Sequence, residues 1–211
     1  MEEFLRDSPT FPQNQGFNNI NEQGSHSVSV LYLNAQSIVN KINELNCVTN
    51  DKQPDIVCIC EAWTKEEITN AFLGLPNYNL ICRSDRKDTK KGVGGGLLIY
   101  VKTELNVSEL NSEYLNDFNQ CAAISLKVNK EIFNICLVYC PHNLYDCNDV
   151  NENNLKLCEV LKKLPKPFII VGDFNFSDID WQSGKYTAKS KDFVECVQNS
   201  FLTQHIDFPT H

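Results

Sequence analysis

Polar side chains with useful chemistry follow several apolar stretches of this sequence, at the points where those stretches end. Asn34, Glu61 and Tyr139 each close one stretch, and Asp173 and Asn175 close another. Carboxylate and amide oxygens are ligands that Mg²⁺ and Mn²⁺ accept, and a phenol can donate a hydrogen bond to phosphate. If these residues lie on one rim, they form a pocket that holds a divalent cation against a phosphate. Each also has an ordinary structural interpretation, because Asn and Asp favour turns, Tyr fits a strand end and Glu61 can start a helix.

The stretches that position these residues have the composition of β-strands. They are short, apolar and bounded by polar turns. The sequence predicts strands at residues 28–33, 55–60, 78–82, 97–101, 121–128, 131–139 and 168–173. The fifth and sixth of these are expected to form a β-hairpin that turns near Asn129 and Lys130. Because helical stripes alternate with the strands, we predict an α/β fold with layered, mixed sheets.

The strand at 168–173, Phe-Ile-Ile-Val-Gly-Asp, is the one around which we expect the fold to be organised. It has no polar face, so it is predicted to be covered on both faces. In open α/β sheets, ligands collect at the carboxyl ends of the strands. Asp173 and Asn175 are therefore expected to project into a crevice. The alternative is that they only form a polar turn that ends the strand.

Helices are expected between these strands. Ser37 precedes an apolar stripe at 38–48 and is predicted to be its N-cap. Thr64 and Glu67 have the spacing of a capping box, which predicts a short helix that ends near Gly74. Two further apolar stripes predict helices at residues 155–164 and 193–201.

Four of the strand-ending elements carry a recognisable pattern. They are Leu33-Asn34-Ala35-Gln36-Ser37, Cys60-Glu61-Ala62-Trp63, Val138-Tyr139-Cys140-Pro141 and Gly172-Asp173-Phe174-Asn175. Together they resemble the endonuclease/exonuclease/phosphatase superfamily, which includes the apurinic endonucleases and DNase I. The Asn-Ala-Gln-Ser and Glu-x-Trp elements, with the later Phe-Leu-Thr-Gln at 201–204, look most like endonuclease domains of non-LTR retrotransposons. The resemblance covers residues 28–211 and implies a DNase I-like, four-layer α/β sandwich.

The resemblance also implies a reaction, hydrolysis of phosphodiester bonds in DNA with Mg²⁺ or Mn²⁺ as cofactor. Glu61 would bind the catalytic metal, and Asn34 would assist at the metal or at the attacking water. Asp173 would orient that water or handle a proton. Asn175 would hold phosphate oxygens, and Tyr139 would donate a hydrogen bond to the scissile phosphate.

Further contacts with the substrate phosphates are expected from two other places. Asn143 follows the Tyr139 element and is implied by the resemblance. Arg83, Arg86 and Lys87 belong to a basic cluster at 83–91, which a glycine-rich run follows. Cations beside flexible backbone can grip a nucleic-acid backbone. For most of these side chains the simpler interpretation is a solvated loop whose glycines relieve a tight turn.

One element of the superfamily pattern is missing from this sequence. Its members end with a strand that carries an acid followed by histidine, and none of the four histidines here follows an Asp. The resemblance therefore implies a domain that is incomplete at its C-terminal end, without the closing strand. Acid–base assistance contributes about 10²–10⁴-fold in rate, so the enzymatic activity of this chain stays open. Phe176 is a second departure, since many relatives carry Thr there.

Two other functions therefore stand beside a DNA endonuclease. The first is a truncated, inactive remnant that serves at most as a module for binding nucleic acid or protein. The second is a phosphatase that acts on a small phosphoester, such as an inositol phosphate or a phospholipid head group. Hydrolysis of DNA and of such small substrates would separate these functions.

Composition limits the partners and the cellular location. The 211 residues suit one domain at 27–211 behind a polar leader at 1–26, which is expected to be disordered. A net charge of -8 excludes binding of DNA through a broadly basic surface, so any DNA contact must be local. Acids stand where a secretory signal carries bases, and no stretch is long and apolar enough for the membrane. The ten cysteines include no C-x-x-C pair and lie in apolar stretches, Cys47 among them, which favours free thiols in the cytoplasm or nucleus.

Overall fold

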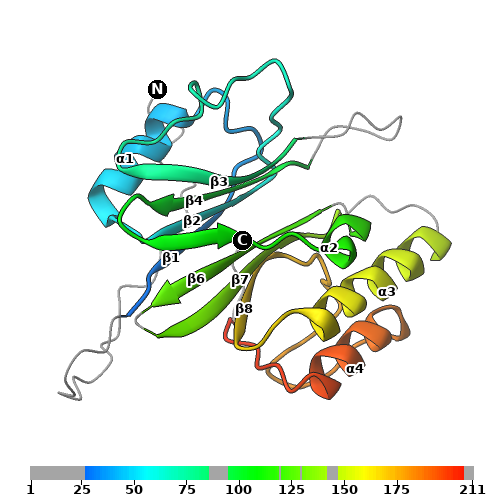
Figure 1. Ribbon diagram of the computed structural model, residues 1–211. Coiled ribbons are helices and arrows are strands. Elements are labelled where there is room, and N and C mark those ends of the chain that lie inside the picture. The colour runs from blue at the N-terminus through cyan, green and yellow to red at the C-terminus, as the bar shows by residue number, and fades with distance from the viewer. Residues whose placement is uncertain (1–26, 86–94, 119, 129, 142–146, 207–211) are drawn as a thin grey trace.

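The computed structural model of the chain describes residues 27–85, 95–118, 120–128, 130–141 and 147–206. The leader at 1–26, most of the basic cluster and the turn residue Asn129 lie outside these ranges. Within them, two four-stranded sheets lie face to face, and helices cover the outer face of each sheet (Figure 1).

The first sheet is built around a parallel pair of strands. Its strands, in spatial order, are β1 (Val30–Asn34), β2 (Ile56–Cys60), β4 (Leu97–Lys102) and β3 (Tyr78–Ser84). β1 and β2 run parallel, whereas β4 is antiparallel to both of its neighbours. The helix α1 (Ile42–Lys52) links β1 to β2 and covers the outer face of this sheet (Figure 1).

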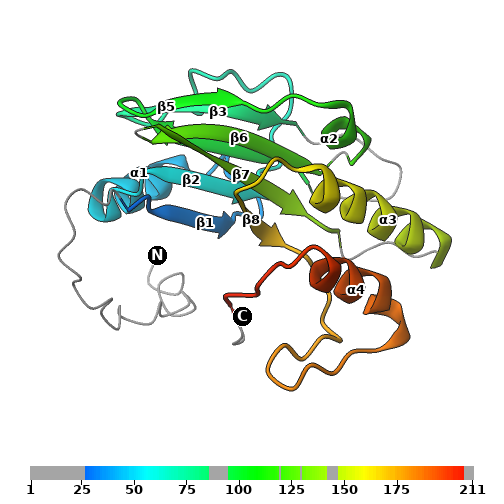
Figure 2. The same cartoon turned by 60° about the horizontal axis from the view of Figure 1, so that its bottom comes forward.

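The second sheet mirrors this plan. Its strands, in spatial order, are β5 (Asn106–Glu109), β6 (Cys121–Val128), β7 (Glu131–Tyr139) and β8 (Phe168–Asp173). The hairpin of β6 and β7 is confirmed, and β8 pairs with β7 in parallel. The helices on the outer side are α2 (Glu113–Asp117), α3 (Cys147–Lys163) and α4 (Lys191–Asn199), with a 3-10 turn, η2, at Ala188–Ser190 (Figure 2).

In the part of the chain that the structure describes, three apolar cores hold these layers together. Every residue of β2 is buried, and its side chains alternate between two cores. Ile56 and Cys58 point into the core between the sheets, whereas Val57 and Ile59 face α1. A third core lies between the second sheet and its helices. A continuous apolar strand needs cover on both faces, which only a layered arrangement supplies, so the four-layer α/β sandwich is confirmed.

Parallel pairing also brings polar strand ends together. In the first sheet Asn34 lies opposite Cys60, the residue before Glu61. In the second sheet Tyr139 lies opposite Asp173. The carboxyl ends of both parallel pairs therefore carry polar side chains that were predicted from the sequence to lie at the site.

The position of β8 differs from the prediction. We expected this strand to be covered on both faces, and that is wrong, because none of its residues is buried. It also forms the edge of the second sheet. Ile169 is 54% exposed, and the remaining residues of the strand are only half-buried. An apolar run of this length does not distinguish an edge strand from a central one.

The start of α1 is also later than predicted. Ser37 is not its N-cap, since the helix begins at Ile42 with Lys41 as N-cap. Ser37 has a left-handed backbone, with φ of 82°, and its N–H donates to the Glu61 carbonyl oxygen at 2.9 Å. The segment between β1 and α1 is thus tied to the loop after β2 instead of continuing the helix.

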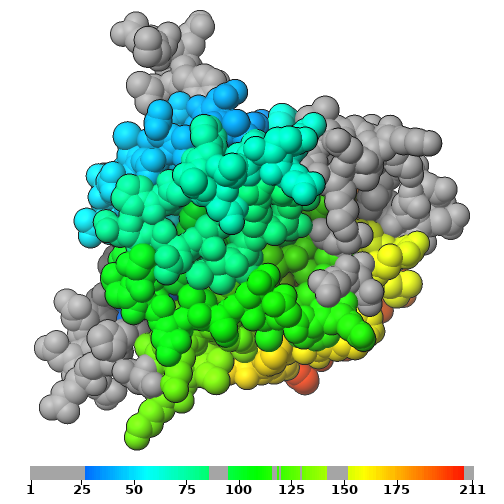
Figure 3. Space-filling model, turned by 45° about the horizontal axis from the view of Figure 1, so that its top comes forward, coloured from blue at the N-terminus to red at the C-terminus, as the bar shows by residue number. Residues whose placement is uncertain are grey.

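The predicted capping box at Thr64 and Glu67 is wrong as well. The Thr64 hydroxyl donates to Asp85 Oδ1 at 2.8 Å, and residues 66–73 form turns instead of a helix. In the space-filling view, the cyan-to-teal segments of this part of the chain spread over one face of the molecule (Figure 3). A tertiary partner has taken the hydroxyl that a local cap would have used.

Smaller differences concern elements without a strong pattern. The prediction gave no structure to β5 or α2, and α3 starts earlier than the predicted 155–164. The nine cysteines whose side chains the structure describes are free thiols, but Cys47 is exposed instead of packed on an apolar helix face. Within those ranges, no helix combines the length and apolarity needed to cross a membrane.

Candidate active site

One side-chain amide joins the ends of three strands. Asn34 Nδ2 donates to Glu61 Oε1 at 3.2 Å and to Asp173 Oδ2 at 3.1 Å. Asn34 ends β1, Glu61 follows β2, and Asp173 ends β8, so the amide connects the two sheets. The carboxylates of Glu61 and Asp173 therefore lie within two hydrogen-bond lengths of each other.

Tyr139 lies beside these carboxylates. It is 7% exposed and pairs with Asp173 across β7 and β8. Burial, followed by the neighbouring Glu61 and Asp173 carboxylates, raises the pKa of the Tyr139 phenol above its ordinary value. The phenol therefore stays protonated and can act as a hydrogen-bond donor.

Asn175 is held by the strand next to its own. Its Nδ2 donates to the Cys140 carbonyl oxygen at 2.6 Å, and Cys140 N–H donates to the Asp173 carbonyl oxygen at 2.8 Å. Asn175 has a left-handed backbone with φ of 54°. These contacts fix the turn that leaves β8 and keep Asn175 beside Tyr139 and Asp173. We call the group of Asn34, Glu61, Tyr139, Asp173 and Asn175 the rim.

Gly172 allows β8 to lie close to β7 next to these residues. Its φ is 152°, and a Cβ at this position would lie 1.8 Å from the Val138 carbonyl oxygen. No side chain fits in that space, so only glycine lets β8 approach β7 this closely one residue before Asp173.

The loop after β2 has an unusual backbone. Glu61 and Trp63 have φ of 51° and 53°, in the left-handed region that non-glycine residues rarely adopt. Hydrogen bonds hold the loop on both sides, from Ala62 N–H to the Gly96 carbonyl oxygen at 3.1 Å and from Ser37 N–H to Glu61. Strain of this kind gathers at functional sites, where surrounding structure holds it in place.

Sequence reasoning assigned no role to Trp63. Its indole Nε1 donates to Glu61 Oε2 at 3.3 Å, so a second nitrogen donor contacts the same carboxylate. The Glu-x-Trp spacing was visible in the sequence. Only the left-handed backbone at both residues, which the sequence does not show, turns the indole back onto Glu61.

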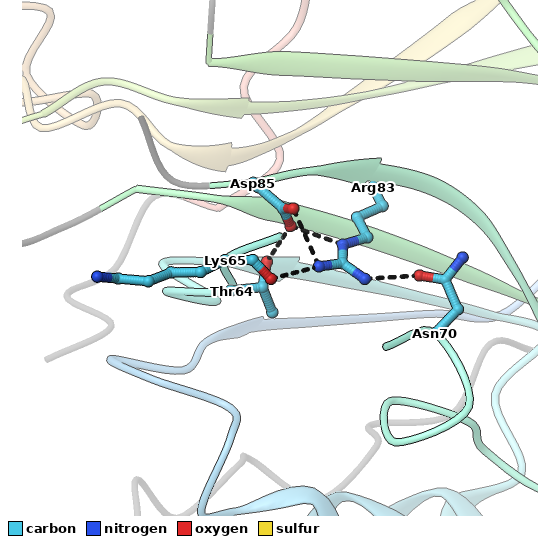
Figure 4. A network of polar contacts seen from close by, with 5 residues as sticks. All are labelled: Thr64, Lys65, Asn70, Arg83 and Asp85. Carbon is cyan, nitrogen blue, oxygen red and sulfur yellow. Dashed lines mark hydrogen bonds and ion pairs between the residues drawn. The ribbon is translucent and has the colours of Figure 1, made fainter. Parts of the chain in front are cut away.

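Arg83, a predicted phosphate contact, donates hydrogen bonds to protein groups in the structure. Its guanidinium donates to both Asp85 oxygens, at 2.6 and 2.9 Å. It also donates to Asn70 Oδ1 and to the Lys65 carbonyl oxygen, each at 2.7 Å (Figure 4). The Arg83 side chain is only 16% exposed. These bonds tie β3 to the loop after β2, and a phosphate would have to break them.

Three other predicted substrate contacts, Asn143, Arg86 and Lys87, lie outside the described residues. A cavity of about 410 Å³ lies elsewhere, between β3 and the start of β6. Its lining includes Ser84 and Glu109 and shares no residue with the cluster of Asn34, Glu61 and Asp173.

The donor atoms at the rim fit a hard divalent cation. Among the described residues, no three His, Cys, Asp or Glu side chains gather into a metal-binding group. Mg²⁺, however, commonly takes one or two carboxylates and completes its shell with water and substrate phosphate. Glu61 and Asp173 supply two converging carboxylates, and no Lys or Arg in the described ranges forms an ion pair with either. A cation here would balance two negative charges that now share one neutral amide.

Solved structures show where this architecture occurs. The endonuclease domain of TRAS1, a telomere-specific non-LTR retrotransposon, aligns with a TM-score of 0.60 at 17% identity, covering 87% of this chain and 76% of its own. An AP endonuclease from Archaeoglobus fulgidus aligns with a TM-score of 0.59 at 17% identity, with 82% and 71% covered. A 3'-5' exonuclease from Neisseria meningitidis gives 0.60 at 16% identity, with 82% and 71% covered. At these identities, the likeness establishes the fold.

Sequence comparison supplies the family. A search of curated proteins gives no match. The family model described as Endonuclease/Exonuclease/phosphatase family matches residues 28–209, which span both sheets and every rim residue named above. The family and the fold indicate a phosphodiesterase of nuclease or phosphatase type. The chain belongs to the endonuclease/exonuclease/phosphatase family.

Proposed function

We propose that this protein is a DNA endonuclease of the retrotransposon type that hydrolyses phosphodiester bonds with a divalent cation, Mg²⁺ or Mn²⁺. The observation that carries the proposal is the Asn34 amide between Glu61 and Asp173, which collects two carboxylates from different sheets at one point. A fold that only needed stability would keep two such carboxylates apart or place a cation between them.

Each rim residue has a part in this proposal that fits its contacts. Hydrolysis requires a water aimed in line at phosphorus and relieved of a proton, which suits the Asp173 carboxylate. Negative charge grows on the non-bridging oxygens, where the protonated Tyr139 phenol and the second N–H of Asn175 can donate. The Asn34 amide donates to both the Asp173 and the Glu61 carboxylate and so holds the two carboxylates close to each other.

Glu61 is the residue that would hold the metal, assisted by Asn34, with the Asp173 carboxylate beside them. When bound there, Mg²⁺ would supply positive charge to the phosphate and neutralise the carboxylates. This local charge would compensate for a chain whose net charge is -8.

The choice of DNA over a small phosphoester is supported by the structural relatives. One is titled a retrotransposon endonuclease domain, one an AP endonuclease, and one a 3' phosphatase bound to a product DNA hairpin. The rim spans two sheets and is not an enclosed cavity, which also suits a polymeric substrate.

A plasmid-nicking assay tests the proposal. Supercoiled plasmid is incubated with the protein and Mg²⁺, with and without EDTA, and conversion to the open circle is measured. We expect nicking that EDTA stops and that Asp173→Asn reduces by at least 10²-fold. Asp51→Asn makes the same chemical change at a side chain that is 79% exposed on α1, and it should nick normally.

Other outcomes would point to the other functions. Nicking that survives both EDTA and Asp173→Asn would remove the proposal. Plasmid that stays supercoiled while an inositol phosphate is hydrolysed would favour a phosphatase. Binding of DNA without hydrolysis of either substrate would favour a binding module.

A further inference from the structure

We infer that Trp63 is a positioning residue whose indole N–H fixes the Glu61 carboxylate for the cation. The inference rests on the proposed function, because it takes Glu61 as a metal ligand. It assigns a role to a side chain that would not touch the substrate or the cation.

Two nitrogen donors contact the Glu61 carboxylate, one on each oxygen. Asn34 Nδ2 donates to Oε1 at 3.2 Å, and Trp63 Nε1 donates to Oε2 at 3.3 Å. Each carboxylate oxygen therefore has one nitrogen donor and keeps lone pairs for another partner. A Glu side chain has three rotatable bonds, so two donors on opposite oxygens restrict both its position and the rotation of the carboxylate.

The backbone of Trp63 is fixed independently of this bond. Its N–H donates to the Gly95 carbonyl oxygen at 3.0 Å. Gly95 has φ of 92°, and a Cβ there would lie 3.0 Å from Gln120 Nε2, so the Gln120 side chain packs directly on this glycine. The backbone carbonyl oxygen of Gln120 in turn accepts from Tyr139 N–H at 2.9 Å. A continuous series of contacts thus runs from Tyr139 in the second sheet to Trp63.

This arrangement differs from ordinary aromatic packing. A tryptophan placed only to fill space could direct its N–H to solvent or to a backbone carbonyl. Here the chain adopts left-handed φ at both Glu61 and Trp63, and the indole N–H reaches the carboxylate two residues earlier. Groups that hydrogen-bond to metal ligands typically change metal affinity by about 10–100-fold when removed.

Calorimetric titration with Mn²⁺ tests the role of the N–H. Trp63→Phe keeps an aromatic ring and removes the donor, and we expect it to weaken Mn²⁺ binding by about 10-fold. Glu66→Gln, at an exposed position in the following loop, should leave binding unchanged. Thermal unfolding of each variant establishes that it is folded.

Tryptophan fluorescence gives a second readout. Trp181→Phe leaves Trp63 as the single tryptophan, and its emission should change saturably with Mg²⁺. Adding Glu61→Gln to that variant should remove the change. Trp63→Phe, which leaves only Trp181, should show no such response.

The results separate this inference from the proposed function. Folded Trp63→Phe protein that binds Mn²⁺ as tightly as the wild type would overturn the inference, even if the wild type nicks DNA. If Trp63→Phe binds Mn²⁺ more weakly than the wild type, and the wild type does not nick plasmid, the inference is upheld and the proposed function is overturned. A wild-type protein that binds no Mn²⁺ would overturn both.

Discussion

Asn34 and Asp173 are 139 positions apart in the chain and are joined by a hydrogen bond of 3.1 Å. The first ends β1 and the second ends β8, so the bond crosses from one sheet to the other. The candidate site is therefore complete only when both sheets are folded and packed. Changes at this bond should affect stability and activity together.

Asn34→Asp is the sharpest test of that bond. It keeps the size of the side chain, removes the donor and adds a third carboxylate beside Glu61 and Asp173. We expect a loss of about 2 kcal/mol in the free energy of unfolding at neutral pH, measured by urea denaturation, and loss of nicking. Asn79→Asp makes the same change at an exposed position of β3. Equal stability of the two variants would contradict the cross-sheet role of Asn34.

Added Mg²⁺ should stabilise the folded protein. A cation that binds at Glu61 and Asn34 binds the native state, and at 100 times its Kd it contributes about 2.7 kcal/mol. The melting temperature measured by circular dichroism should therefore rise with Mg²⁺. The rise should be absent in Glu61→Gln and present in Glu66→Gln. A rise of the same size in both variants would place the cation elsewhere.

Much of the candidate site could be predicted from the sequence, because strand ends are readable. A short apolar run followed by one polar residue marks where a strand leaves the core, as at Asn34 and Asp173. The parallel order of β1 with β2 and of β7 with β8 then follows from the helices between them. No sequence pattern of this kind indicates which residues of different sheets will contact each other.

Two of the predictions that failed, the helix caps at Ser37 and Thr64, concern side chains with two possible partners. Ser37 and Thr64 can both cap a helix. In the structure Ser37 N–H donates to the Glu61 carbonyl oxygen and the Thr64 hydroxyl donates to Asp85, and both acceptors lie far along the chain. Arg83 has the charge to bind phosphate, yet its donors go to protein acceptors. Local patterns give the residues that can form such bonds, and tertiary packing selects among them.

Gly172→Ala should disrupt the edge of the second sheet. Because the added Cβ would lie 1.8 Å from the Val138 carbonyl oxygen, β8 must shift away from β7. We expect a loss of at least about 3 kcal/mol in the free energy of unfolding. Gly184→Ala is a matched control, since its φ of 68° is also positive but no atom lies within 4 Å of the added Cβ. That variant should lose only about 1 kcal/mol.

Denaturant unfolding of both glycine variants measures this difference. If Gly172→Ala and Gly184→Ala lose the same stability, the cost comes from the backbone conformation alone. The close approach of β8 to β7 would then not constrain the residue before Asp173.

The last prediction concerns pH and a carboxylate outside the candidate site. Asp55 lies just before β2, and it accepts from Ser29 N–H at 2.8 Å and from Lys102 Nζ at 2.9 Å. Burial alone would raise the pKa of Asp55, but the bonds from Ser29 and Lys102 outweigh it and lower the pKa from its ordinary value of 3.8. The charged form is thus favoured in the folded state.

A lowered carboxyl pKa stabilises the fold above the unfolded-state pKa and loses that effect as the pH falls through the folded-state value. Asp55→Asn should therefore be less stable than the wild type by about 2 kcal/mol at pH 7. The difference should shrink once the pH falls below 3.8, the ordinary pKa of the group. Urea unfolding at several pH values measures it, with the exposed Asp51→Asn as control. A difference that stays constant from neutral to strongly acidic pH would show that Asp55 acts through its shape and not through its charge.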